Sequence, residues 1–156
     1  NQEQDSPPRP QSVGFVLASL AVSLLDAGDT KGALDVVQRA LAAEPGQPEA
    51  LAVRAEARCR EGDFDAALRD VEVVLAVQPV HLRARAVRGE VRLAQGERDQ
   101  ALADFDAVLS VKPDHPTSLL LRAVARRDAG DRWLAVEDAT SLLHLEPENV
   151  EALVLR

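Results

Sequence analysis

The stretch that decides the fold is GDFDAALRDVEVVLAVQP, residues Gly62–Pro79. Related stretches recur in the same register, at Gly28–Pro45, Gly96–Pro113 and Gly130–Pro147. The leading glycines (28, 62, 96, 130) and the closing prolines (45, 79, 113, 147) both step by 34 residues. A fixed period of roughly 20–50 residues is typical of a solenoid, in which each repeat buries its apolar face against its neighbours. The sequence therefore predicts a repeat array.

Each repeat contains two helical patterns. In residues 48–81, apolar residues recur at steps of three and four, which is the period of a helix and not of a strand. Gly62 lies between the two patterns, where a tight turn needs a residue that adopts a left-handed conformation. Asp63 can cap the second helix, and Pro79 ends it because proline cannot donate the next backbone hydrogen bond. We therefore expect an all-α fold of helix–turn–helix repeats.

The register divides the chain into a leader, four repeats and part of a fifth. Residues 1–12 are rich in proline and polar side chains, so we expect a flexible leader there. The expected repeat domain spans 13–156, with repeats 14–47, 48–81, 82–115 and 116–149 and a partial or capping helix at 150–156. Because the chain has no methionine, we expect a processed chain or a piece of a longer protein.

Composition and charge narrow the class of protein. The net charge of −8 argues against a nucleic-acid partner and against an anionic membrane surface. The apolar run Val13–Leu25 is shorter than the roughly 20 residues of a membrane-spanning helix. We interpret it as a core helix, with the apolar region of a signal peptide as the alternative. We expect a soluble chain; its single cysteine leaves the compartment open, with a slight preference for the cytoplasm.

The repeats resemble the tetratricopeptide repeat (TPR) family, whose 34-residue units carry a turn glycine, small residues where helices touch and a closing proline. The small-residue places hold Ala33, Ala67, Ala101 and Ala135. The family's large residue early in the first helix is here Leu17, Leu51, Arg85 and Leu119, and its mid-helix tyrosine is Leu24, Arg58, Arg92 and Arg126. The resemblance implies a right-handed solenoid with a concave groove that binds peptides or helices, and it implies no chemistry of its own.

Arginines recur at two places of the repeat. The first place holds Arg54, Arg88, Arg122 and Arg156, and the second, one helical turn later, holds Arg58, Arg92 and Arg126. Asp70, Asp104 and Asp138 follow Arg54, Arg88 and Arg122 by 16 residues. In the first repeat, Leu20 and Val36 replace both members together. This joint replacement predicts ion pairs inside each repeat, while a basic strip for a phosphate polymer is the alternative.

If the family geometry holds, the first helix of each repeat lines the groove. The expected partner-binding residues are Phe15, Ala18, Val22, Glu49, Ala52, Glu56, Arg83, Ala86, Glu90, Leu120, Val124 and Arg127, with Leu25, Cys59, Leu93 and Thr117 beside them. Small side chains let a ligand lie close, and the central acids favour a ligand that bears lysine or arginine. Alternatively, these residues pack between helices, or the groove holds the leader, a missing neighbouring segment or another copy of the chain.

We expect no catalytic residue, no cofactor and no metal. His81 and His115 have no ligand at metal-binding spacing, and Cys59 has no evident histidine partner. Some TPR proteins grip the terminal carboxylate of a partner with basic side chains. The matching places here are Ala18, Val22, Val53, Arg83 and Val87. Only Arg83 is basic, so we expect no carboxylate binding.

The sequence thus favours a protein–protein interaction scaffold that holds a peptide or helix of a partner. A structural self-association module is one alternative. A targeting or regulatory arm of a larger enzyme or co-chaperone is another.

Overall fold

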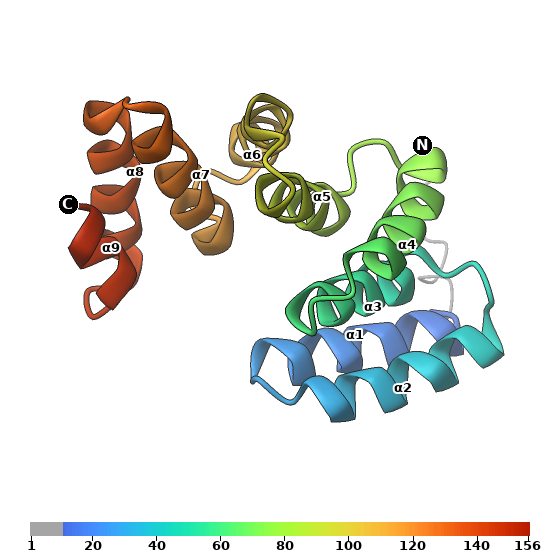
Figure 1. Cartoon of the computed structure of the whole chain (residues 1–156). Coiled ribbons are helices and arrows are strands. Elements are labelled where there is room, and N and C mark those ends of the chain that lie inside the picture. The colour runs from blue at the N-terminus through green and yellow to red at the C-terminus, as the bar shows by residue number, and fades with distance from the viewer. Residues whose placement is uncertain (1–10) are drawn as a thin grey trace, which may run out of the picture.

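A computed structural model describes residues 11–156, and every regular element in that range is an α-helix (Figure 1). The helices are α1 (Val13–Asp26), α2 (Thr30–Ala43), α3 (Pro48–Arg60), α4 (Phe64–Val77), α5 (Leu82–Ala94), α6 (Arg98–Val111), α7 (Pro116–Ala129), α8 (Arg132–Leu145) and α9 (Val150–Leu155). Consecutive helices pair as hairpins, from α1–α2 to α7–α8, so the predicted all-α fold is confirmed. Most of the predicted leader lies outside the described residues; Ser12, at its end, caps α1.

The glycine turns form as the sequence predicts. Gly28, Gly62, Gly96 and Gly130 all have positive φ, between 81 and 93°. Residues with a Cβ rarely adopt this conformation, which explains why glycine recurs there. Asp63 follows the turn and its carboxylate accepts the backbone N–H of Ala66, which caps α4. Pro48 and Pro116 occupy the first turn of α3 and α7, where the missing N–H costs nothing.

A second capping position recurs two residues after each closing proline. Four different side chains fill it, and each accepts a backbone N–H from the helix that follows: Gln47, His81, His115 and Asn149. The chain therefore starts α3, α5, α7 and α9 with the same geometry and different chemistry.

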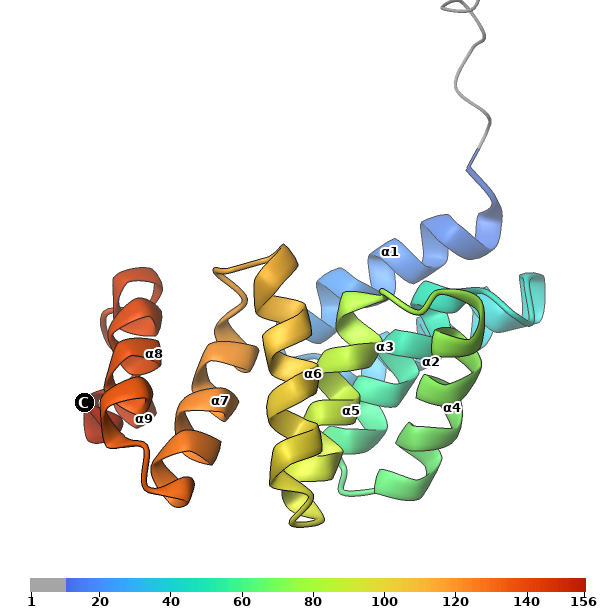
Figure 2. The same ribbon diagram turned by 90° about the horizontal axis from the view of Figure 1, so that it is seen from above.

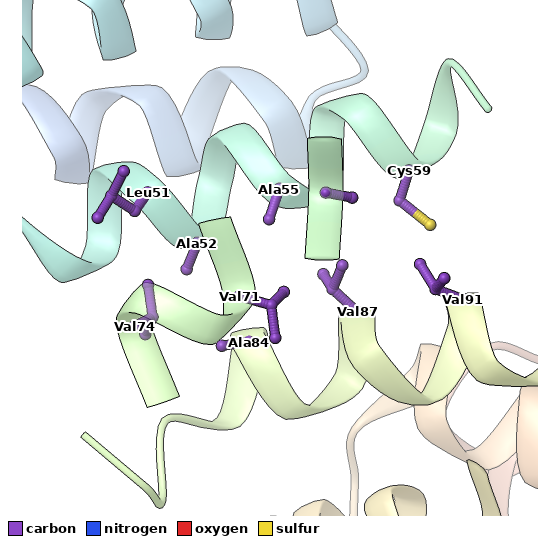
Figure 3. Close-up of a cluster of buried hydrophobic side chains, with 10 residues drawn as sticks. Leu51, Ala52, Ala55, Cys59, Val71, Val74, Ala84, Val87 and Val91 are labelled. Carbon is purple, nitrogen blue, oxygen red and sulfur yellow. The ribbon is translucent and has the colours of Figure 1, made fainter. Parts of the chain in front are cut away.

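The hairpins stack side by side, and the core is a series of small clusters between them (Figure 2). One cluster joins α1, α2 and α3, and the next joins α3, α4 and α5. In the second, Val87 and Val91 of α5 point towards Ala55 and Cys59 of α3 (Figure 3). Because alanine fills most contact points, the helices approach closely, and a core with only 3% aromatic residues suffices.

Candidate functional site

Each of the second, third and fourth hairpins buries an aspartate between two arginines. In the third, Arg88 Nη2 lies 2.6 Å from Asp104 Oδ1, and Arg92 Nη1 lies 2.7 Å from Oδ2. Only 4% of the Asp104 side chain is exposed. The other two triads are Arg54–Asp70–Arg58 and Arg122–Asp138–Arg126. The predicted pairing within a repeat is confirmed in these three hairpins, so these guanidinium groups are engaged within the fold.

The second arginine of each triad was not predicted to join the pair. The sequence nevertheless indicates it. The place that holds Arg58, Arg92 and Arg126 in the last three repeats holds Leu24 in the first. Leucine and valine therefore replace all three members of the triad at once in the first repeat. Comparison of all three places across the repeats, and not of two, would have predicted the whole triad.

The concave side of the stack carries a hollow of about 700 Å³. It is lined by Asp26, Glu49, Glu56, Arg60, His81, Leu82, Arg83, Ala86, Val87, Glu90, Lys112, His115, Pro116, Thr117 and Glu146. Five of the twelve predicted partner-binding residues are among them: Glu49, Glu56, Arg83, Ala86 and Glu90. These five come from α3 and α5, and the start of α7 closes the far side.

The other seven predicted residues do not line this hollow. Ala18 and Ala52 are fully buried between helices, so no ligand can touch them in this arrangement. Val22 packs beside the first core cluster and Leu120 beside the last. Phe15 is 41% exposed near the start of α1. Val124 is half-buried on α7, and Arg127 is exposed and pairs with Asp128.

Arg83 occupies the centre of the acidic lining. Its guanidinium reaches from α5 to α3, where it pairs with Glu56 and lies 3.3 Å from Glu49. Arg60 Nη2 also binds Glu56, at 2.7 Å. Arg60 Nη1 donates a hydrogen bond to the carbonyl oxygen of Leu25, at the end of α1. Arg83 is thus neutralised by acids of its own chain, which supports the expectation that the hollow does not grip a carboxylate.

Glu90 is a half-buried acid of the hollow whose pKa is raised mainly by burial, although the charge of Arg60 acts in the opposite direction. Among residues 11–156, no lysine or arginine nitrogen lies within 4.0 Å of its carboxylate. Burial raises the pKa of Glu90, and the negative charge of Glu56 raises it further. Burial, followed by the charge of Glu90, also raises the pKa of the Cys59 thiol to about 12. Cys59 therefore stays protonated and unreactive at neutral pH, while Glu90 favours a cation beside it.

Two histidines border the hollow as helix caps. His81 Nδ1 accepts the Ala84 N–H, and its Nε2 lies 2.9 Å from Glu49 Oε2. This hydrogen bond, with help from the charge of Arg83, lowers the pKa of Glu49. Burial lowers the pKa of His115, and the nearby positive charge of Lys112 lowers it further.

We expect acid to weaken the start of α7 through His115. Because the folded-state pKa of His115 lies below its ordinary value of about 6.5, the unfolded chain takes up the proton first. The contribution of His115 to the free energy of unfolding is therefore fully present above about pH 6.5. It decreases as the pH falls from that value towards the lower folded-state pKa. Protonated Nδ1 cannot accept the Ser118 N–H, and such a cap is worth roughly 1 kcal/mol.

Urea unfolding at pH 8 and pH 5.5 measures this loss. The matched variant is His115→Asn, because Asn149 caps α9 at the equivalent place. It should unfold at a similar urea concentration to the native chain at pH 8 and lose less stability at pH 5.5. Equal losses in the two proteins would show that His115 is not responsible.

Two further observations concern residues 11–156. No group of three or more His, Cys, Asp or Glu side chains there is placed to hold a metal ion. None of the helices in that range combines the length and apolar character needed to cross a membrane.

Comparison with known families identifies the class of repeat. Two profiles described as tetratricopeptide repeat match the chain, one over residues 19–76 and the other over residues 57–126. The chain belongs to the tetratricopeptide repeat family. TPR proteins are generally non-catalytic scaffolds for protein–protein interaction. Among curated protein sequences, none matches this chain significantly.

Several solved structures share the fold. TTC0263, a thermophilic TPR protein of Thermus thermophilus, is 26% identical, with a TM-score of 0.71, over 86% of this chain and 75% of that one. PilW, a type IV pilus biogenesis factor, is 21% identical with a TM-score of 0.73, over 91% of this chain and 66% of its own. A MamA fragment from Desulfovibrio magneticus RS-1 is 22% identical, with a TM-score of 0.64. The match covers 89% of this chain and 78% of the MamA fragment.

Proposed function

We propose that this chain is a non-catalytic scaffold whose concave hollow binds a segment of a partner protein that carries a basic side chain. The observation that carries the proposal is Glu90, a half-buried carboxylate that lines the hollow with no lysine or arginine nitrogen of the described residues within 4.0 Å. A guanidinium or ammonium group placed beside it would compensate the charge that burial and Glu56 disfavour. The partner-contacting residues are Glu49, Glu56, Arg83, Ala86, Glu90 and Thr117.

Size and charge of the hollow agree with such a ligand. About 700 Å³ is within the range of roughly 300–1,000 Å³ that is typical of ligand-binding clefts. Its lining holds five carboxylates, from Asp26, Glu49, Glu56, Glu90 and Glu146, against the three basic side chains of Arg60, Arg83 and Lys112. The excess negative charge disfavours an acidic segment and favours a basic one.

Short alanine-based peptides that differ only in bearing arginine, glutamine or glutamate at the same positions test the proposal. We expect the arginine peptide to bind most tightly in titration calorimetry. Glu90→Gln should weaken that binding about 5- to 10-fold, which corresponds to about 1–1.4 kcal/mol. The control is Glu72→Gln, which removes the same charge from an exposed site on α4 outside the hollow. Equal binding of all three peptides, or an equal effect of both variants, would overturn the proposal.

A second candidate function is self-association, which the exposed apolar side of α1 favours. Val13 is 66% exposed, Val16 52% and Leu20 48%. These residues are spaced three and four apart, so they lie on one side of the helix. Light scattering over a concentration series separates this function from peptide binding, since a chain that stays monomeric cannot be such a module.

A further inference from the structure

The buried clusters of the core divide between α5 and α6, and the contact between α5 and α7 is sparse. The first two clusters share α3, and Leu41 packs against both. The remaining cluster draws only on α6, α7, α8 and α9 and shares no helix with them. Although α7 contacts α6 about as extensively as α5 contacts α4, it contacts α5 far less than α5 contacts α3. In Figure 1, α7–α9 accordingly stand to one side of the first six helices.

Ser118 marks this junction chemically. The equivalent place holds Ala50, Ala84 and Ala152, all fully buried. Ser118 is also fully buried, and its Oγ has no hydrogen-bond partner among the described residues. A buried hydroxyl without a partner is unfavourable, and exposure to water relieves it. Ser118 thus makes close packing of the start of α7 less favourable than alanine would, and an opening that admits water there relieves this cost.

Neighbouring places on the same contact are under-packed. Leu121 of α7 is half-buried, whereas Val53 and Val87 at the equivalent place are 0% and 3% exposed. Leu93 of α5 is also half-buried, whereas Leu25 and Cys59 at its place are 0% and 5% exposed. Since the packing area sets most of the contact energy, the α5–α7 contact is the weak one in the stack.

The opposite edge of the junction is tied. Leu109 of α6 and Leu119 of α7 belong to the same buried cluster. Arg122 Nη1 of α7 also lies 2.7 Å from Asp106 Oδ1 of α6. We infer that α7, α8 and α9 swing as one body about the α6–α7 edge, so that the contact between α5 and α7 opens and closes.

This motion acts on the concave hollow, because the two sides of the junction line it together. Glu56, Arg83 and Glu90 stand on one side, and His115 and Thr117 on the other. The swing changes the width of the hollow and so controls the entry of a segment. Only this last consequence rests on the proposed function; the swing itself does not.

Distances between pairs of spin labels on the full chain test the swing. Arg69 of α4, Ala103 of α6 and Glu137 of α8 are exposed and occupy the same place in successive repeats. In a Cys59→Ala background, Arg69→Cys with Ala103→Cys spans the tight junction, and Ala103→Cys with Glu137→Cys spans the weak one. We expect the second distance distribution to be at least about twofold wider than the first.

Ser118→Ala should narrow the distribution across the weak junction alone. Ser141→Ala, the same change on the exposed side of α8, should leave it unchanged. In the reverse direction, Ala84→Ser should widen the distribution across the tight junction. Equal widths in the native chain, or no response to Ser118→Ala, would overturn the inference. These distances are measured without ligand, so their outcome is separate from that of the peptide titration.

Discussion

Asp104→Ala should be among the most damaging single substitutions in this chain, with a loss of about 3 kcal/mol of unfolding free energy. The change leaves two arginines, Arg88 and Arg92, facing an apolar gap between α5 and α6. Removing one partner of a buried ion pair costs about 3–5 kcal/mol, much of it from the charge left behind. We place the loss at the lower end because both arginine side chains are more than a quarter exposed. Urea unfolding followed by circular dichroism measures it.

The first repeat supplies the control for this prediction. At the three equivalent places it has Leu20, Leu24 and Val36, so the fold accepts an apolar version of the triad. The triple variant Arg88→Leu, Arg92→Leu, Asp104→Val should therefore be more stable than Asp104→Ala, although it lacks three charges and not one. A triple variant that is as unstable as the single one would show that the cost lies in lost bonds and not in orphaned charge.

The pair Gly89 and Phe105 should show the strongest coupling in the core. Phe105 is fully buried, and its ring occupies the space where residue 89 has no side chain. A Cβ on Gly89 would lie 2.7 Å from Phe105 Cε1. Gly89→Ala should thus lose about 1–3 kcal/mol from overpacking, despite the better helix propensity of alanine. Phe105→Val should also lose stability by leaving a cavity, although less than the about 3–5 kcal/mol typical of Phe→Ala.

Together the two changes should largely cancel. The first repeat has Ala21 with Val37 at these places and the second has Ala55 with Val71, so the double variant copies a pair that the fold already uses twice. Thermal and urea unfolding of the four proteins form a double-mutant cycle. Additive losses would mean that the ring and the missing side chain do not share the same space.

The sequence was most informative where chemistry repeats in register. The positive φ of the turn glycines and the proline starts of α3 and α7 follow from what those residues can adopt, so position alone predicted them. The Arg88–Asp104 pairing was predicted because one repeat replaces both members with apolar residues. Arg92 was not predicted to join this pair, because its place in the repeat was compared with the mid-helix tyrosine of the TPR family and not with the place of Asp104.

The groove was predicted less well, since its lining depends on how far neighbouring helices approach. Glu49, Glu56 and Glu90 carry charges, which must reach the surface or a partner, and they line the hollow. Ala18 and Ala52 have no such requirement, and alanine permits the close approach that buries it. Lys112 and Glu146, which directly follow α6 and α8, also line the hollow, although neither belongs to the first helix of a repeat.

The buried triads also make the electric charge of the molecule uneven. They contain six of the 18 basic residues and three of the 26 acidic ones, which leaves 12 basic against 23 acidic residues in the rest of the chain. The net charge of −8 is unchanged, but a surplus of positive charge is held between the helices of three hairpins. Away from them the potential is more negative than the net charge implies. Such faces speed the diffusional encounter with cationic molecules, and dissolved salt weakens the attraction beyond roughly 10 Å.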